Sequence, residues 1–203
     1  MKNKFFIGCA VIAGIVIFIG LIMVFTGIGS YNKMVKMDEA VKSKWSQVEN
    51  VYQRRYDLIP NLVETVKGYA AHEKETFQLV TEARAKVGGV INITGQDLNN
   101  PEKFQQFQQA QNGLSSALQR LMVVVEKYPE LKANQNFLAL QDQLEGTENR
   151  ITVERQAFNN TAQEFNTYIK QFPRVIIANL FGFKEKQYFK AQESASQAPK
   201  VKF

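Results

Sequence analysis

The chain has 203 residues and a formal net charge of +6, from 25 Lys and Arg against 19 Asp and Glu. The basic residues are scattered rather than gathered in an arginine-rich face with stacking aromatic rings, so the composition argues against nucleic-acid binding. The length accommodates one soluble domain of about 160 residues beside one membrane segment. A single cysteine, Cys9, excludes an intrachain disulfide.

The first feature along the chain is an uncharged apolar stretch at residues 5–28. As a helix it would rise about 36 Å, against a hydrocarbon core of about 30 Å, so it predicts an N-terminal transmembrane anchor within residues 1–30. The stretch is too long for a signal-peptide core, and no clear cleavage site follows it. The residues before Cys9 imitate a bacterial lipoprotein box, but too few apolar residues precede it, and the plain anchor is favoured. Positive charges flank both ends, so the orientation stays open.

Apolar residues then recur every seven positions across a long seam. One series is Tyr31, Asp38, Trp45, Tyr52, Ile59 and Val66, and the other is Met34, Val41, Val48, Arg55, Leu62 and Tyr69. This repeat predicts one long amphipathic helix from Tyr31 to Val87, kinked at Pro60. The alternative is two helices that meet at Asp57–Pro60.

Two further helices follow a loop that is predicted from Gly88 to Asn100. Asn100 followed by Pro101 is typical of a helix start, so the second helix is expected from Pro101 to about Lys127. The third is expected from Asn134 to Gln171, with a seven-residue repeat of Phe137, Leu144, Ile151, Phe158, Phe165 and Phe172. The predicted fold is all-α: residues 31–190 form a long antiparallel bundle of three helices, the first kinked at Pro60, or of four if the chain turns back there.

The remaining residues change character after Pro173. We expect a short apolar helix, a turn at Gly182, an aromatic and basic segment, and a disordered tail at residues 191–203. The aromatic residues of this region, together with its basic ones, could lie on a membrane surface. The favoured alternative is that they cap the end of the bundle. The aromatic residues are Phe181, Phe183, Tyr188 and Phe189.

Three stretches carry a resemblance to a known family. They are QRRYDLIPNLVETVKGYAAHE, ENRITVERQAFNNTAQEFNTYIKQFP and FGFKEKQYF. They resemble the LemA family of bacterial membrane-anchored helical proteins, over residues 31–189. The resemblance implies a helical fold and a single-pass location in the bacterial cell (inner) membrane. It implies no established biochemical activity.

The chain carries no pattern that points to catalysis. His72-Glu73 begins like a zinc-peptidase motif, but the second histidine is replaced by Thr76, and the chain has only one histidine. A di-iron bundle would require Glu-x-x-His pairs, which are absent from the sequence. We therefore expect no enzyme, no cofactor, and no catalytic, cofactor-binding or metal-binding residues.

Polar residues inside the apolar seams predict internal contacts. Arg55 stands at a seam position, and a charge is almost never buried without a partner, so Arg55 or Arg54 is expected to meet Glu148 or Glu154. A structural ion pair is favoured over a polar binding groove. Asn159 and Asn166, seven residues apart on the third helix, are expected to bond across helices.

The sequence as a whole predicts a membrane-anchored interaction or assembly scaffold without catalytic activity. We expect self-association, because a continuous first helix would leave its seam at residues 31–52 without a partner inside the chain; a folded-back bundle would cover that seam and leave a monomer. The partners expected are the lipid bilayer through residues 5–28 and further copies of the chain. The alternative is an accessory or sensor protein that binds a peptide or membrane-protein partner, such as a membrane protease, through a bundle groove.

Overall fold

The computed structural model describes residues 2–91, 93–95 and 97–190. Within them all regular structure is helical. The elements are α1 (Lys2–Lys67), α2 (Lys74–Val90), the short 3-10 helix η1 (Asp97–Asn99), α3 (Pro101–Val125), α4 (Pro129–Lys132), α5 (Gln135–Lys170) and α6 (Arg174–Phe181). The all-α prediction is confirmed for the part of the chain that the structure describes.

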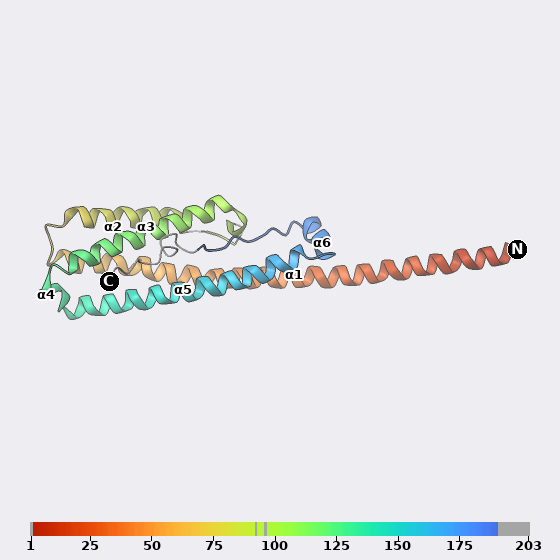
Figure 1. The fold of residues 1–203 in the computed structure, drawn as a ribbon, viewed down its shortest axis with the longest axis horizontal. Helices are drawn as coiled ribbons and strands as arrows, with labels where there is room; N and C mark the ends of the chain where they lie inside the picture. The colour runs from red at the N-terminus through yellow and green to blue at the C-terminus, as the bar shows by residue number, and fades with distance from the viewer. Residues whose placement is uncertain (1, 92, 96, 191–203) are drawn as a thin grey trace, which may run out of the picture.

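The four long helices α1, α2, α3 and α5 run side by side in alternating directions (Figure 1). The N-terminal part of α1 projects far beyond the bundle, and α6 lies beside α1 near the point where α1 leaves it. After α6 the chain returns along the bundle as an extended segment, residues 183–190, which we call the C-terminal segment. The architecture is an up-and-down four-helix bundle with one helix extended at its N-terminal end.

The reversal after the first helix lies at residues 68–73, not at Asp57–Pro60. The helix continues through Pro60, as the single-helix option predicted, but it ends at Lys67 instead of Val87. The turn begins at Gly68, and Ala70 in the turn is 1% exposed. Val80 and Val87 on α2 keep the same heptad register as Val66 on α1, so the heptad pattern could not reveal the change of direction. Gly88 and Gly89, expected in a loop, lie in the last turn of α2.

Pro60 is tolerated inside α1 because a neighbouring helix compensates for it. Proline has no backbone N–H, so the carbonyl of Tyr56, four residues earlier, loses its helical partner. Nε of Arg84 on α2 donates to that carbonyl at 3.4 Å, and the Arg84 guanidinium lies 3.9 Å from the centre of the Tyr56 ring. The bond that proline removes from α1 is thus replaced by a contact that ties α2 to α1.

The predicted ends of α3 and α5 are confirmed. The Asn100 side chain accepts hydrogen bonds from the backbone N–H groups of Glu102 and Lys103, and the Asn134 side chain caps α5 by accepting one from Phe137. Four of the six residues in the predicted seven-residue repeat are buried: Phe137, Ile151, Phe158 and Phe165. Leu144 is half-buried, and Phe172 is 81% exposed. Phe172 is exposed because α5 ends at Lys170 and the seam ends with it.

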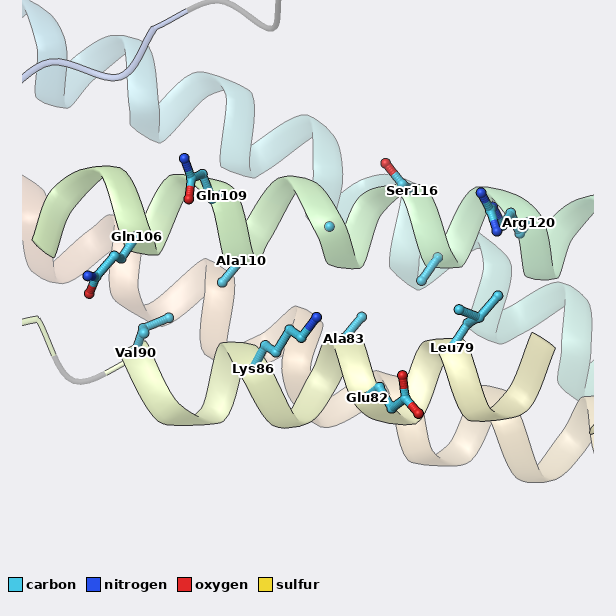
Figure 2. Close-up of a pocket in the computed structure, with 12 residues that line it drawn as sticks. Leu79, Glu82, Ala83, Lys86, Val90, Gln106, Gln109, Ala110, Ser116 and Arg120 are labelled. Atoms are coloured by element: carbon cyan, nitrogen blue, oxygen red, sulfur yellow. The ribbon is translucent and has the colours of Figure 1, made fainter. Parts of the chain in front are cut away.

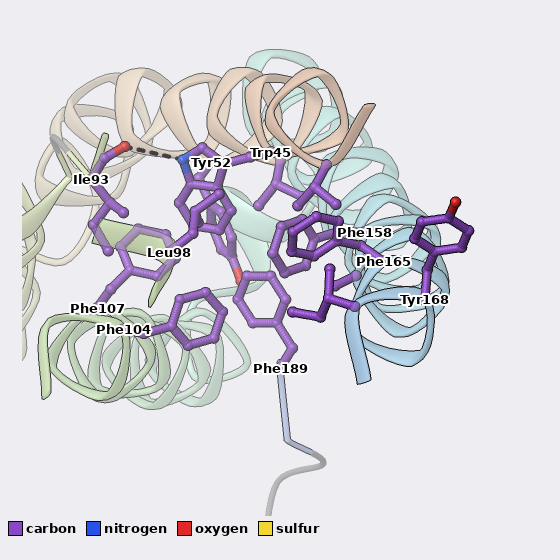
Figure 3. Packing of buried hydrophobic residues seen from close by; sticks show 14 of the residues in the cluster. Trp45, Tyr52, Ile93, Leu98, Phe104, Phe107, Phe158, Phe165, Tyr168 and Phe189 are labelled. Carbon is purple, nitrogen blue, oxygen red and sulfur yellow. Dashed lines mark hydrogen bonds between the residues drawn. The ribbon is translucent and has the colours of Figure 1, made fainter. Parts of the chain in front are cut away.

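The core falls into two clusters along the bundle. The distal cluster, farther from the N-terminus, joins residues of α1 such as Ile59, Leu62 and Val66 to α2, α3 and α5. The proximal cluster, nearer the N-terminus, surrounds Trp45, whose ring centre lies 5.4–5.9 Å from those of four phenylalanines (Figure 3). The indole N–H of Trp45 donates to the carbonyl of Ile93 at 3.0 Å. The four phenylalanines are Phe104, Phe107, Phe158 and Phe189.

The premise for self-association through residues 31–52 is therefore wrong. Met34, Val41, Trp45, Val48 and Tyr52 are only 0–3% exposed. They are covered within the chain by residues of α3, α5 and α6 and by the C-terminal segment. Association of copies is not needed to remove this seam from water.

Within the described residues, no helix has the length and apolar character needed to cross a membrane. The predicted span at residues 5–28 includes positions 5–13, 16, 19 and 23, whose side chains lie outside the described residues. The predicted disordered tail, residues 191–203, also lies outside them. The domain limits at residues 30 and 190 stay predictions.

The compensation at Pro60 predicts a coupling between Pro60 and Arg84. Arg84→Ala should lower the free energy of unfolding in the native sequence, because it strands the Tyr56 carbonyl, at a cost of roughly 1–3 kcal/mol. In a Pro60→Ala background the restored N–H of residue 60 would bond that carbonyl, so the same change should cost clearly less. Chemical denaturation of the four variants measures the coupling.

The matched control is a second set of four variants in which Asn61→Ala takes the place of Pro60→Ala. Asn61 is the adjacent residue on α1 and is exposed. The cost of Arg84→Ala should be the same with and without Asn61→Ala. An equal cost of Arg84→Ala in the native chain and in the Pro60→Ala background would contradict the compensation.

Candidate functional site

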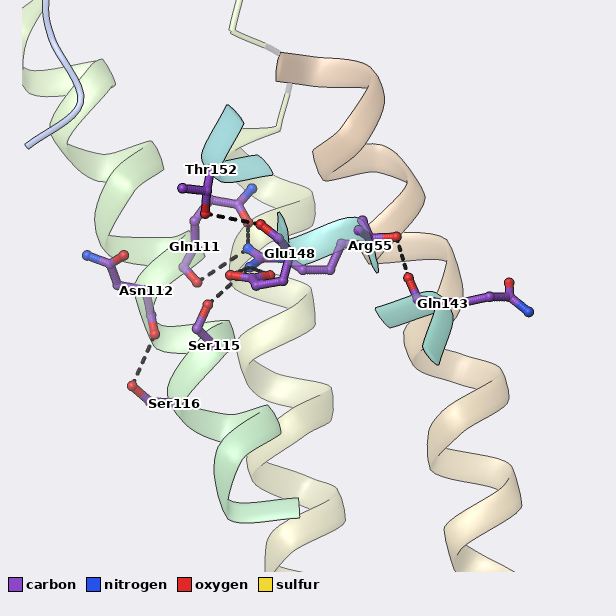
Figure 4. Close-up of polar contacts among 9 residues, drawn as sticks. Arg55, Gln111, Asn112, Ser115, Ser116, Gln143, Glu148 and Thr152 are labelled. Atoms are coloured by element: carbon purple, nitrogen blue, oxygen red, sulfur yellow. Dashed lines mark hydrogen bonds and ion pairs between the residues drawn. The ribbon is translucent and has the colours of Figure 1, made fainter. Parts of the chain in front are cut away.

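Arg55 lies at the centre of a polar cluster between α1, α3 and α5 (Figure 4). The Arg55 side chain is buried, and its Nη1 lies 2.9 Å from Oε2 of Glu148 and 3.0 Å from Oγ of Ser115. Its Nη2 donates to the side-chain oxygen of Gln111. The predicted ion pair is confirmed with Glu148 as the partner, and Glu154 and Arg54 are not part of it.

The Arg55–Glu148 pair connects the interior to a surface groove. Glu148 is half exposed and belongs to the lining of a hollow of about 700 Å³ between α3 and α5, which we call the α3–α5 groove. Its lining residues span positions 115–126 on α3 and 137–148 on α5, so it extends about 16 Å along both helices. The groove arises because α3 packs mainly on α2 and α5 mainly on α1.

The α3–α5 groove combines an apolar floor with three carboxylates in its lining. Glu126 is paired with Lys132 at 2.5 Å and Glu148 with the buried Arg55, so within the described residues Glu145 alone of the three carries a charge without an ion pair. The apolar floor and its length suit an amphipathic helix of about three turns. The apolar lining residues include Leu118, Met122, Val125, Phe137, Leu138 and Leu144, and the carboxylates are Glu126, Glu145 and Glu148.

A second groove of about 630 Å³ lies between α2 and α3 (Figure 2). It is present because small residues, Ala83 and Ala110 among them, line the space between the two helices. Its lining carries both signs of charge, with Glu82 and Lys86 on α2 and Arg120 on α3. It therefore has no charge preference that would select a ligand class.

The C-terminal segment is held by two asparagines of α5, an arrangement that we call the asparagine clasp. Asn159 exchanges two hydrogen bonds of 2.9 Å with the backbone N–H and carbonyl of Phe189. Asn166 does the same with the backbone of Lys186, at 2.8 and 2.9 Å. The expectation that these amides bond across helices is wrong: their partner is the backbone of an extended segment.

The spacing of the two asparagines matches the spacing of the backbone groups they hold. Seven residues of helix rise about 10.5 Å, and three residues of extended chain, from position 186 to 189, span about 10 Å. The asparagines therefore bind the backbone of the C-terminal segment at two points along one face of α5. Side chains on α3 and α5 add two further bonds, Gln108 to the Tyr188 carbonyl and Arg155 to the Lys190 carbonyl.

The side chains of the segment complete the core. Phe189 is 6% exposed and lies in the aromatic cluster around Trp45 (Figure 3). Lys186 is 4% exposed, and its Nζ lies 2.6 Å from Oδ1 of Asp38 on α1. Burial acts to raise the pKa of the Asp38 carboxyl, but the bonds from Lys186 and Lys42 outweigh it and hold that pKa below its usual value.

The favoured interpretation, that these aromatic residues cap the end of the bundle, is right only in part: Phe183 is partly buried against Tyr31, but Phe189 lies inside the proximal cluster beside Trp45. Phe181 and Tyr188 are exposed at 58% and 40%. Sequence reasoning missed that positions 186 and 189 are the partners of Asn159 and Asn166. The one sequence signal was that the spacing of Asn159 and Asn166 matches that of residues 186 and 189. Every residue has the same backbone groups, so the sequence does not show which of them accept or donate such bonds.

His72 is exposed in the turn at residues 68–73 and is not on a helix face. Among the described residues, no group of three or more His, Cys, Asp and Glu side chains is placed to hold a metal ion. The side chain of Cys9 lies outside the described residues.

Comparison with known proteins gives a consistent set of relatives. The model of the LemA family matches residues 44–203. The chain is 31% identical over 174 residues to magnetosome protein MamQ of Magnetospirillum gryphiswaldense, covering 78% of this chain and 64% of that protein. It is 29% identical over 188 residues to magnetosome protein MamQ 2 of Paramagnetospirillum magneticum, covering 83% and 67%. Protein LemA of Metamycoplasma hominis is 23% identical over 172 residues, covering 85% and 74%.

The chain thus spans about two thirds of the length of the two magnetosome relatives. The stretch that matches the family model includes α2 to α6 and the C-terminal segment.

The asparagine clasp predicts a local loss of protection when Asn159 is removed. Asn159→Ala leaves the backbone N–H and carbonyl of Phe189 without partners, which should cost roughly 1–3 kcal/mol of stability. Amide hydrogen exchange at Phe189 should speed up markedly. The matched control is Asn160→Ala, because Asn160 is the next residue and is exposed. Equal exchange rates at Phe189 in the two variants would contradict the clasp.

Proposed function

Because this chain belongs to the LemA family, we propose that it is a membrane-anchored helical scaffold that acts through binding rather than catalysis. The observation that carries the proposal is the continuity of α1, which joins the uncharged stretch at residues 5–28 to the centre of the bundle in one helix. A helix without a break sets the distance between the bundle and whatever holds its N-terminal end.

The exposed apolar side chains of this helix support an anchor in lipid. Eight large apolar residues between positions 15 and 28 are 47–72% exposed: Ile15, Ile17, Phe18, Leu21, Ile22, Val24, Phe25 and Ile28. Burying such side chains is worth roughly 1.5–3 kcal/mol each, so leaving them in water is unfavourable by many kcal/mol. A bilayer core removes that penalty on all sides of the helix at once.

The anchor would place the bundle as a rod on one side of the membrane. Residues 31–67 of α1 rise about 55 Å, so the far end of the bundle would stand well away from the lipid. The α3–α5 groove lies toward that end, beside the start of α5 (Figure 1). A protein of this shape presents a binding surface at a fixed distance from the bilayer.

A second candidate function rests on the α3–α5 groove. Its apolar floor favours an accessory or sensor protein that binds an amphipathic helix of a membrane-protein partner. If the chain is a scaffold, further copies or several partners assemble on the rod. If it is an accessory protein, one partner occupies the α3–α5 groove.

Membrane extraction tests the anchor. The full chain should stay with the membrane fraction at alkaline pH. Ile17→Arg with Leu21→Arg should release it, because each Arg near the centre of a span costs roughly 2.5–3.5 kcal/mol. The control variant carries the same two charges at exposed positions of the bundle, Val123→Arg with Val153→Arg. This variant should stay in the membrane fraction. A native chain found in the soluble fraction would contradict the proposal.

The same membranes separate the two candidates after mild solubilisation. A scaffold should return several partners or further copies of itself, which stay bound when Leu138→Asp charges the groove. An accessory should return one stoichiometric partner, which this change removes. Leu138 is 43% exposed, so this change should leave the bundle folded.

A further inference from the structure

The bundle exposes a group of large apolar side chains at the end where α1 leaves it. Phe172, Ile176, Leu180 and Phe181 are 58–81% exposed, and we call them the α6 apolar face. Single exposed apolar residues are common on protein surfaces, but a group of this kind marks an interaction site.

The orientation of α6 explains why this face points outward. Ile176 and Leu180 are four residues apart and share one side of the helix. Ala178 is 2% exposed, and Ile177 packs against the proximal cluster, so the other side of α6 is in the core. The αL conformation of Gly182 (φ 77°) ends the helix and turns the chain back along the bundle. The α6 apolar face is therefore held in place on the bundle, and its residues stay 58–81% exposed although Phe181 contacts Tyr31.

Aromatic contacts fix the level of α6 along α1. The ring of Tyr31 lies 4.7 Å from that of Phe181 and 5.8 Å from that of Phe183. Tyr31 is three residues beyond Ile28, the last residue of the uncharged stretch, and three residues of helix rise about 4.5 Å. The polar layer on each side of a bilayer is roughly 5–8 Å thick. With residues 5–28 in the hydrocarbon core, a step that rests on the proposed function, α6 lies at the level of the lipid headgroups.

The charges around α6 complement anionic lipid. Residues 29–36 and 170–185 contain five basic residues and one acidic residue, Glu185, which pairs with Lys170 at 2.7 Å. Arg174 and Lys33 both lie against the ring of Tyr168 on α5, 4.2 and 4.8 Å from its centre. An apolar face surrounded by cations is typical of helices that bind the membrane interface. The five basic residues are Lys33, Lys36, Lys170, Arg174 and Lys184.

We propose that α6 is a second membrane contact: its apolar face enters the interfacial layer of an anionic bilayer while the surrounding basic residues bind lipid phosphates. One helix alone fixes the position of the bundle but leaves its tilt and rotation free. Two contacts, the N-terminal part of α1 and α6, set which side of the bundle faces the membrane.

Depth-dependent fluorescence quenching in reconstituted vesicles tests the proposal. The full chain, with Cys9→Ser, carries a single cysteine labelled with an environment-sensitive fluorophore at Leu180→Cys, or at Ile176→Cys as a second position. The matched control is Val153→Cys, since Val153 is an exposed aliphatic residue on α5 (61%) far from α6. The vesicles contain phosphatidylcholine and phosphatidylglycerol, with a spin label near the headgroup.

The labels at 180 and 176 should emit at shorter wavelength and be quenched several-fold more strongly than the label at 153. If the protein floats with the vesicles but the three labels are quenched equally, α6 does not touch lipid and the inference is wrong, while the anchor stands. Energy transfer between labelled copies without lipid quenching would mean that a second copy covers the face, which also overturns the inference. A chain that does not float with the vesicles would overturn both proposals.

Discussion

The structure depends on closing the seam of α1 between residues 34 and 52 without a further long helix. Over much of this stretch α1 has only α5 as a long neighbour, because α3 begins near Trp45 and α2 lies farther along the bundle. The remaining side is closed by α6, by Ile93 and Leu98, and by the C-terminal segment. Phe189 of that segment lies against Trp45 and is held by the backbone bonds of Asn159 and Asn166. An extended segment thus performs the covering that a helix performs elsewhere in the bundle.

Side-chain amides suit this task because they satisfy a backbone N–H and a carbonyl together. An extended segment that lies on a helix has no strand beside it, so its buried polar groups need partners from side chains. Asn159 and Asn166 supply both bonds at two points, and Lys186 adds an ion pair to Asp38 on the opposite helix. The segment therefore joins α1 to α5 and makes the proximal half of the bundle one unit with the chain's C-terminal part.

Patterns that act locally predicted most of the fold. The caps at Asn100 and Asn134 and the pairing of Arg55 with Glu148 followed from residue type and register, because each depends on the side chain itself. The turn at residues 68–73 was missed because Val80 and Val87, which lie on the next helix, keep the heptad register of Val66. The asparagine clasp was missed because its partners are backbone groups, and the resulting coverage of Trp45 removed the reason to expect association of copies.

The central claim is that the C-terminal segment, not a second copy, covers the proximal seam. The most direct measurement is amide hydrogen exchange of the full chain with Phe189→Ala, with Lys190→Ala at the exposed neighbour as control. Removing a buried phenylalanine side chain should cost roughly 3–5 kcal/mol. We predict that protection falls mainly at residues 34–52 of α1 and much less at residues 59–66, and that the control matches the native chain. Unchanged protection at residues 34–52 in the Phe189→Ala protein would contradict the account.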